Sequence, residues 1–277
     1  MATVDIIIPS CRTPELTYLA VASFEYFKQS HTFRYIVVEN SNDESYRDRI
    51  ISNFPNTIWV QNQTDLTLSN ANAIALTRGL AAVSSDYVFM CHNDVAVCHE
   101  SWMNYLVSKL DEGHSLIGMC FDAQPGRIKA AHSSGILVKS EIAKAVSLYP
   151  VYDDSGTVLL DVCDSLTKYC RDNGLPYFIC NNTFNDPKYL DLIPETKFRE
   201  FHVDRALNNK NEVIYLHLGR GHSKYNDHYY RPNRILMPEW IEFVTSVLDI
   251  EELMSFQSSR DRRPITKFFR KLLRWRT

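Results

Sequence analysis

Three polar residues that can bind a cation or accept hydrogen bonds stand together at His92-Asn93-Asp94. They directly follow residues 87–91, a short apolar run that is long enough for a buried strand. Open α/β sheets bind their ligands at the carboxyl ends of such strands, and this is where the carboxylate of Asp94 would lie. The alternative is an ordinary strand followed by a polar turn, so the neighbouring motifs must decide between the two interpretations.

A second polar motif, HLGRGH at residues 217–222, follows another short apolar run at 213–216. Glycines allow a backbone to approach phosphate closely, Arg220 offers a fork of donors, and a histidine such as His217 can complete a metal shell. A structural turn that carries a surface arginine explains the same residues equally well.

Acidic residues later in the chain are candidates for proton transfer. Asp161 and Asp164 are three positions apart, which places both on one face of a helix expected at 157–172. Asp204, in the segment FHVDR at 201–205, is a further candidate. The alternative for Asp161 and Asp164 is that both are solvated acids on an amphipathic helix.

Alternating strand and helix patterns must position these residues. Strands are predicted at residues 4–9, 35–39, 57–60, 87–91, 116–121, 134–138 and 213–216. Helices are predicted at about residues 13–29, 44–53, 71–82, 99–112, 157–172 and 238–252. Residues 181–201 are rich in loop signals and are expected to overlie the site. This alternation indicates an α/β fold with a mostly parallel sheet and helices on both faces.

Composition favours a protein of the cytoplasm. The 277 residues include seven cysteines, which form no CxxC pair and suggest reduced thiols rather than disulfides or a zinc finger. No apolar run approaches the roughly 20 residues of a membrane span, and the N-terminal residues show no signal-peptide pattern. We therefore expect a cytoplasmic location.

The C-terminal residues differ from the rest of the chain. Residues 260–277 carry a net charge of +7, whereas the whole chain carries −3, so the remainder is acidic and nucleic-acid binding is not expected. We expect a main domain at 1–255 and a basic amphipathic tail at 256–277. The apolar and basic residues of this tail suit a helix lying on an anionic membrane surface. A helix docked on the acidic domain, or a disordered basic end, is the alternative.

Several motifs together resemble the family 2 glycosyltransferases with a GT-A fold. They are VDIIIPS at 4–10, YIVVENSND at 35–43, NQTDLTLSNANAIALTRGLAAV at 62–83 and DYVFMCHND at 86–94. The resemblance covers roughly residues 4–180. It implies a GT-A fold, Rossmann-like with a mostly parallel central sheet, plus a C-terminal helical extension. It also implies an inverting, metal-dependent transfer of sugar from a UDP-, GDP- or dTDP-sugar donor to a glycan or glycolipid, as in surface polysaccharide or lipopolysaccharide biosynthesis.

The resemblance also assigns roles to individual residues. Asp94, the last residue of the DxD-type motif, is the expected ligand of Mn²⁺ or Mg²⁺, and His217 is its expected partner. His92 stands where the family often has a first aspartate, so it contacts either the ribose or the cation, or is a packed histidine. Glu39 is expected to read the nucleobase. The other residues expected at the donor are Pro9, Ser10, Arg12, Asn72, Asn93 and Arg220.

The acceptor side follows from the same resemblance. The family's catalytic base lies in an "ED" motif followed by Arg and Gly, and LDVCD at 160–164 with Arg171 and Gly174 is similar to it. Asp161 is therefore the first candidate for the base, followed by Asp164. Asp204 is the third, because the segment at 201–205 also resembles an ED-type helix start. Ser134-Gly135 resembles the small-residue strand on the acceptor side.

Two other functions fit a similar sheet. A sugar-phosphate nucleotidylyltransferase would need a glycine-rich phosphate loop after the first strand, and residues 10–13 contain no glycine. A glycosyltransferase-like binding module that has lost catalysis is the second alternative, and His92 in place of the expected aspartate is the feature that supports it.

Overall fold

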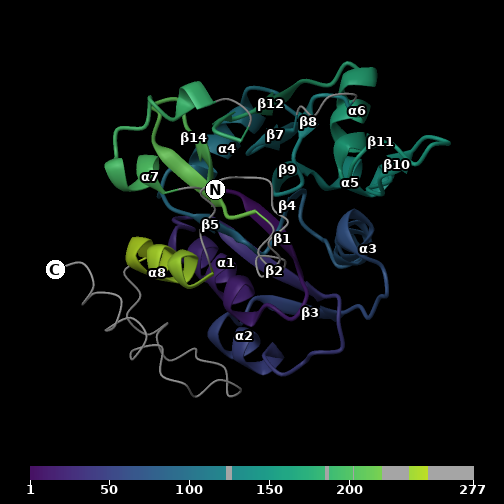
Figure 1. Ribbon diagram of the computed structural model, residues 1–277, viewed down its shortest axis with the longest axis horizontal. Coiled ribbons are helices and arrows are strands. Elements are labelled where there is room, and N and C mark those ends of the chain that lie inside the picture. Colours follow the sequence, from purple (N-terminus) through teal and green to yellow (C-terminus); the bar gives the residue numbers. More distant parts are fainter. Residues whose placement is uncertain (123–126, 185–186, 202, 220–236, 249–277) are drawn as a thin grey trace.

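The first strand, β1 (Thr3–Ser10), lies inside a seven-stranded sheet whose strand order is β12-β6-β9-β4-β1-β2-β3 (Figure 1). The structure is a computed structural model, and it describes residues 1–122, 127–184, 187–201, 203–219 and 237–248. All strands of this sheet share one direction except β9 (Gly135–Lys139), which is antiparallel to both of its neighbours. The other strands are β2 (Thr32–Glu39), β3 (Thr57–Gln61), β4 (Tyr87–Cys91), β6 (Leu116–Gly118) and β12 (Tyr177–Ile179).

A smaller antiparallel sheet adjoins the carboxyl end of β4. Only three residues separate β4 from β5 (Val95–Val97), which is the edge strand of a four-stranded sheet in the order β13-β14-β15-β5. Its other members are β13 (Asn181–Asn182), β14 (Asp204–Leu207) and β15 (Val213–His217). Two short pairs complete the strands, β7 (Phe121–Asp122) with β8 (Ala130–Ala131), and β10 (Val151–Tyr152) with β11 (Val158–Leu160).

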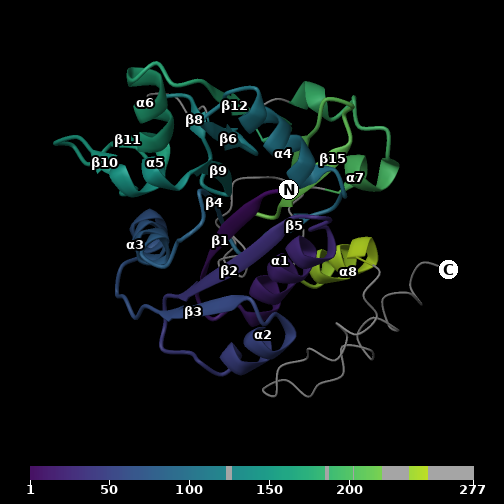
Figure 2. The same cartoon turned by 180° about the vertical axis from the view of Figure 1, so that it is seen from behind.

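Helices cover both faces of the main sheet. Successive side chains of a strand point to opposite faces, so the apolar strands present an apolar surface on each side for helices to pack against. Ile6 and Ile8 of β1 join one core cluster and Ile7 joins the other. Helices α1 (Pro14–Tyr26), α4 (Trp102–Asp111) and α8 (Met237–Leu248) pack in the first cluster, and α3 (Leu68–Leu80), α5 (Ser140–Ala145) and α6 (Asp164–Asp172) in the second (Figure 2). Two further helices, α2 (Arg47–Asn53) and α7 (Thr196–Glu200), and a 3₁₀ turn at Pro187–Tyr189 complete the described elements.

The expected α/β architecture is confirmed, with local corrections. The helix predicted at 157–172 is wrong in its first half, because β11 occupies Val158–Leu160 and α6 begins only at Asp164. The strand predicted at 116–121 is interrupted after Gly118. The helix start predicted at 201–205 is wrong, since β14 begins at Asp204. In each case pairing with another strand, β10, β8 or β15, overrides the local sequence pattern.

The expected tail at 256–277, like Arg220 and His222, lies outside the described residues. Among the residues that are described, no helix combines the length and apolar character needed to cross a bilayer. The membrane-surface role of the tail and the domain boundary near residue 255 stay predictions.

A buried ion pair fixes the amino-terminal edge of the sheet, opposite the edge that carries the polar motifs. Asp5, 1% exposed, accepts two hydrogen bonds from Arg34 at 2.8 and 2.7 Å, and the N–H groups of Ser84 and Ser85 donate to it at 2.7 and 3.0 Å. Burial alone would raise the pKa of Asp5, but these hydrogen bonds outweigh burial and hold the pKa below its usual value.

We expect Asp5→Asn to lower the free energy of unfolding at pH 7 by about 1–3 kcal/mol. Because the folded-state pKa lies below the unfolded one, the ionised carboxylate stabilises the protein above the unfolded pKa of about 4, and this contribution disappears as the pH falls through the folded pKa. Denaturant unfolding of both proteins across the acid range measures the effect. A difference between them that stays constant down to low pH would contradict it.

Candidate functional site

The polar motifs gather at one edge of the main sheet because β1, β2 and β4 are parallel. Ser10 at the end of β1 is paired with Glu39 at the end of β2, and His92-Asn93-Asp94 follows β4 directly. The carboxyl ends of parallel strands are where α/β sheets bind ligands. Asp94 is 3% exposed there, as expected for a carboxylate that is built into a site rather than solvated.

Antiparallel pairing brings His217 to Asp94 across more than a hundred residues of sequence. In the register of β15 with β5, His217 lies opposite Val95, the residue after Asp94. The N–H of Leu218 then donates to the main-chain oxygen of Asp94 at 2.8 Å. The smaller sheet thus positions the histidine that the sequence motif could only propose.

Three side chains are arranged as a metal-binding group. Oδ1 of Asp94 lies 3.8 Å from Nδ1 of His92 and 3.6 Å from Nε2 of His217. One ligand atom from each residue lies within 4.8 Å of the other two. A divalent cation bound there would have the carboxylate of Asp94 and an imidazole nitrogen as ligands.

The imidazole of His217 fits such an ion because of how it is buried. Its side chain is 4% exposed, and neither ring nitrogen has a hydrogen-bond partner among the residues that the structure describes. An uncompensated buried nitrogen is costly, and a cation at Nε2 would remove that cost. His217 therefore fits the metal-ligand role that the sequence predicted for it.

Asp204 lies behind His217 rather than at a helix start. Oδ2 of this buried aspartate is 3.3 Å from Nδ1 of His217, on the side of the ring away from Asp94. A carboxylate in this position favours a proton on Nδ1 and leaves the lone pair of Nε2 facing Asp94. The geometry gives Asp204 a role in orienting His217, whereas the sequence suggested it as the third choice of base.

His92 is held by other neighbours. Its Nε2 lies 3.1 Å from Nδ2 of Asn72, on α3, and 3.0 Å from Oγ of Ser133. The amide nitrogen of Asn72 donates to Nε2, so the neutral ring carries its proton on Nδ1, the nitrogen that faces Asp94. Asn72, expected at the donor, thus lies at this site through its contact with His92.

His132 was missed by the sequence analysis. Its ring centroid lies 5.6 Å from that of His92 and 5.5 Å from that of His217. The N–H of Ser134 donates to Nδ1 of His132 at 3.2 Å, so the neutral ring carries its proton on Nε2 and is a donor there. The only signal in the sequence was its place two residues before the Ser134-Gly135 motif.

Glu39 ends β2 with a carboxylate that is fully buried. It accepts hydrogen bonds from the N–H groups of Arg12 and Ser41 at 3.2 and 3.0 Å and from the hydroxyls of Ser41 and Tyr46. Burial first, and then the neighbouring Glu39, raise the pKa of Tyr46 far above its usual value, so the phenol stays protonated and donates. In this arrangement Glu39 orders two loops, and its role in reading a base stays a prediction.

A chain of hydrogen bonds continues from Tyr46 to the end of β4. Oγ of Ser10 lies 2.6 Å from the Tyr46 hydroxyl and 2.7 Å from Oγ1 of Thr17. Nδ2 of Asn93 donates to Oγ1 of Thr13 at 2.5 Å and to Oγ1 of Thr17 at 3.2 Å. Ser10 and Asn93, both predicted at the donor, therefore hold the three strand ends in fixed positions.

Two further donor-side residues lie on the first strand and its loop. Pro9 is buried within β1, and Arg12 follows the strand as an exposed residue with a φ of 53°. Nη2 of Arg12 lies 3.4 Å from Oδ1 of Asn42, which places the guanidinium at the same sheet edge. The contacts of Pro9, Arg12 and Arg220 with a nucleotide stay predictions, the last outside the described residues.

The two candidate bases belong to a cluster around Arg127. Its guanidinium nitrogens lie 2.9 Å from Asp164, 3.4 Å from Asp161 and 3.2 Å from Asp122. Asp161 precedes α6, so the predicted shared helix face is wrong, yet Arg127 brings the two carboxylates together. The sequence analysis gave Arg127 no functional role, although Asp122 lies only five residues before it.

Asp161 and Asp164 differ in exposure. The Asp164 side chain is 2% exposed, and its Oδ2 accepts hydrogen bonds from Arg127 and from the N–H of Asp161. Burial raises the pKa of Asp164 against the opposing effect of those two donors. The Asp161 side chain is 29% exposed and so is the one of this pair that a second substrate can reach.

Helix α6 also contacts the His132 segment, since Thr167 accepts a hydrogen bond from the N–H of Ala131.

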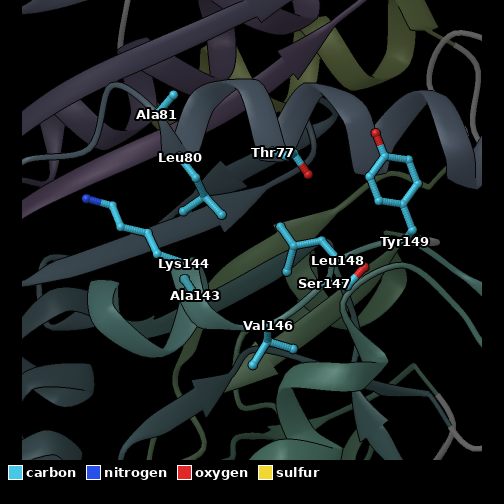
Figure 3. A pocket seen from close by; sticks show the side chains of 9 residues that line it. All are labelled: Thr77, Leu80, Ala81, Ala143, Lys144, Val146, Ser147, Leu148 and Tyr149. Atoms are coloured by element: carbon cyan, nitrogen blue, oxygen red, sulfur yellow. The ribbon is translucent and has the colours of Figure 1, made fainter.

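A cavity of about 340 Å³ lies elsewhere, between α3 and residues 143–149 (Figure 3). Thr77 and Leu80 of α3 line it on one side, and Leu148 and Tyr149 lie on the other. None of its lining residues belongs to the metal-binding group or to the Arg127 cluster. It contributes no group to the chemistry considered for the sheet edge.

No family model and no curated protein sequence matches the chain. Several solved structures are similar to it. A mannosyltransferase from Pyrobaculum calidifontis, in complex with GDP-Man and Mn²⁺, is similar at a TM-score of 0.47 and 13% identity, over 64% of this chain and 54% of its own. Glucosyl-3-phosphoglycerate synthase from Mycobacterium tuberculosis, in complex with Mn²⁺, UDP and phosphoglyceric acid, gives 0.46 and 16%, over 64% and 68%. TarS from S. aureus, in complex with UDP-GlcNAc, gives 0.39 and 14%, over 54% and 48%.

The matched region is about half the length of the mannosyltransferase and of TarS and about two thirds of the synthase. Glycosyltransferases, the class that the sequence motifs resemble, are thus among the solved structures to which this chain is similar.

Proposed function

We propose that this chain is a metal-dependent glycosyltransferase that moves a sugar from a nucleotide-sugar donor to a hydroxyl group of a glycan or glycolipid, with inversion at the anomeric carbon. One observation carries the proposal. A buried carboxylate, Asp94, stands between two imidazoles at the carboxyl edge of a mostly parallel sheet. This is a site for a cation beside the place where such sheets bind nucleotides.

Departure of a nucleoside diphosphate concentrates negative charge on its oxygens. A divalent cation, Mn²⁺ or Mg²⁺, neutralises part of that charge when it is bound. Asp94 and His217 would hold the cation, and Asp204 would keep His217 in the required tautomer. Nε2 of the neutral His132 ring would donate a hydrogen bond to an anionic oxygen of the donor.

The acceptor hydroxyl must lose a proton as it attacks the anomeric carbon. Asp161 is our candidate for the base, because it is the more exposed of the two carboxylates held by Arg127. Asp164 would then position Asp161, whose N–H it binds at 2.7 Å. Direct attack by the acceptor on the face opposite the leaving group gives inversion.

The acceptor class and the location extend the same proposal. A glycan or glycolipid of the surface polysaccharide or lipopolysaccharide type, made in the cytoplasm, suits an enzyme with a basic tail at 256–277 that reaches an anionic membrane surface. The basic and apolar composition of this tail is what supports the acceptor class and the location.

A screen of UDP-, GDP- and dTDP-sugars with Mn²⁺ tests the proposal. The nucleotide that binds should raise the apparent stability by about 2.7 kcal/mol at a concentration of 100 Kd, and its sugar should be released to water or to an added acceptor. Stabilisation without turnover would instead favour the binding module. Pyrophosphate formed from a sugar phosphate and a nucleoside triphosphate would favour the nucleotidylyltransferase. If no nucleotide sugar were bound or turned over, the transferase, the binding module and the nucleotidylyltransferase would all be contradicted.

A further inference from the structure

We infer that Arg127 is a positioning residue for the base of the sugar-transfer reaction, and that it holds the carboxylate of Asp161 in place from an anchor of two buried carboxylates. The inference rests on the proposed function and adds a residue to its acceptor side. In that reaction the acceptor oxygen forms a bond to the anomeric carbon, the bond to the diphosphate breaks, and the hydroxyl proton passes to Asp161.

The guanidinium of Arg127 is itself fixed from two sides. Its side chain is 7% exposed, and its anchors are Asp122, at the end of β7, and Asp164, at the start of α6. Nη1 lies 3.2 Å from Oδ2 of Asp122, and Nη2 lies 2.9 Å from Oδ2 of Asp164. Both carboxylate side chains are at most 4% exposed, so these ion pairs lie where the effective dielectric constant is low and charges attract strongly. Arg127 is therefore a rigidly held donor rather than a surface arginine.

Asp161 lies outside regular structure, between β11 and α6, and it depends on contacts for its position. Two residues later, Cys163 has a φ of 69°, which is rare for a residue other than glycine. The N–H of Asp161 donates to Oδ2 of Asp164 at 2.7 Å, which fixes the main chain. The N–H of Val162 donates to Oδ1 of Asp161 at 2.7 Å, and Nη1 of Arg127 lies 3.4 Å from Oδ2. Arg127 thus orients the second oxygen of this carboxylate.

The charges of the cluster show which partner gains from that contact. When ionised, Asp122 and Asp164 together carry more charge than one guanidinium, so Arg127 needs no third carboxylate to be neutralised. Asp161 adds a further like charge, which is unfavourable for all three carboxylates. It is also the most exposed of them, at 29% against 4% and 2%. A third carboxylate that is held despite repulsion and left open to a substrate suits a positioned base better than a structural ion pair.

Arg127→Lys tests the inference, because an ammonium keeps the positive charge but lacks the planar fork that contacts several carboxylates at once. Acceptor-dependent transfer and acceptor-independent donor hydrolysis are measured on one preparation of the full chain. The kcat for transfer should fall by about 10- to 100-fold, as for a displaced catalytic group, while hydrolysis and the KM for the donor change little. An unchanged kcat for transfer, or an equal fall in both rates, would overturn the inference.

Chemical rescue of Arg127→Ala gives a readout that a merely structural role would not move. Guanidinium chloride at tens of millimolar should supply the missing group and restore transfer several-fold. The same addition should restore nothing in the double variant Arg127→Ala/Asp161→Asn, because the carboxylate to be oriented is gone. Rescue that persists without Asp161, or no rescue of a folded Arg127→Ala, would contradict the positioning role. If Arg127→Ala does not fold, Arg127→Lys decides alone.

Arg34→Ala is the matched control. Arg34 also pairs with a buried carboxylate, that of Asp5, but at the opposite edge of the sheet. Its loss should lower the melting temperature and leave the ratio of transfer to hydrolysis unchanged, with or without guanidinium. A fall in this ratio as large as that in Arg127→Lys would mark the effect as lost stability and remove the special role of Arg127.

These outcomes separate the inference from the proposed function. Normal transfer by Arg127→Lys would remove the positioning role and leave the transferase in place. An absence of transfer by the wild type with every nucleotide sugar would contradict the proposed function, and the positioning role with it.

Discussion

Asp94→Asn is expected to lower kcat/KM for Mn²⁺-dependent sugar transfer by at least about a thousandfold, which corresponds to about 4 kcal/mol of transition-state stabilisation. Asn has the shape of Asp but lacks the charge, so the substitution should weaken cation binding and leave the fold intact. Asp94 lies within 4 Å of the imidazoles of His92 and His217, and no other carboxylate of the described residues belongs to the metal-binding group.

Steady-state rates with the preferred donor, with Mn²⁺ saturating, measure this effect. Asp86→Asn is the matched control, because this exposed aspartate immediately precedes β4 at its other end. It should leave kcat/KM unchanged. Asp94→Asn with near wild-type turnover and an intact melting transition would place the metal elsewhere.

Asp161→Asn is expected to lower kcat for transfer to the acceptor by about 10²- to 10⁴-fold, the usual contribution of a general base. The KM for the donor should change little, since the Arg127 cluster does not include the metal-binding residues. Slow hydrolysis of the donor should persist, because water can attack without the acceptor. Acceptor-dependent and acceptor-independent rates measured on the same preparation separate the two effects.

Asp164→Asn distinguishes the two carboxylates. Asp164 is buried and bound to Arg127, so its substitution should lower the melting temperature as well as the rate. Asp172→Asn, at the exposed end of the same helix, should change neither. The opposite result is that Asp164→Asn abolishes transfer to the acceptor without lowering the melting temperature, while Asp161→Asn stays fully active. That result would make Asp164 the base and Asp161 the positioning residue.

The sequence was informative where function follows from a strand and the residues directly after it. The end of β4 and the DxD-like motif are adjacent in the chain. The apolar run at 87–91 therefore predicts the strand and also places Asp94 just beyond the strand's carboxyl end. The four parallel strands β1 to β4 were found for the same reason, since each contains a short apolar run bounded by polar residues.

The rest of the site depends on pairings that no local pattern records. His217 meets Asp94 only through the register of β15 with β5, and β5 is too short to stand out in the sequence. Asp204 was assigned to a helix start because the segment at 201–205 resembles an ED motif, but pairing with β15 makes the segment a strand and places the carboxylate behind His217. Arg127 and His132 carry no motif of their own, and only the fold brings them to the site.

The most direct measurement is the affinity of the protein for a nucleoside diphosphate with and without Mn²⁺, determined by calorimetry for the wild type and for Asp94→Asn. If a cation at Asp94 links the protein to the phosphates, each ligand strengthens the other, and Mn²⁺ should tighten binding of the preferred UDP, GDP or dTDP by about tenfold or more in the wild type alone. Equal affinity with and without Mn²⁺, or the same gain in Asp94→Asn, would contradict the account.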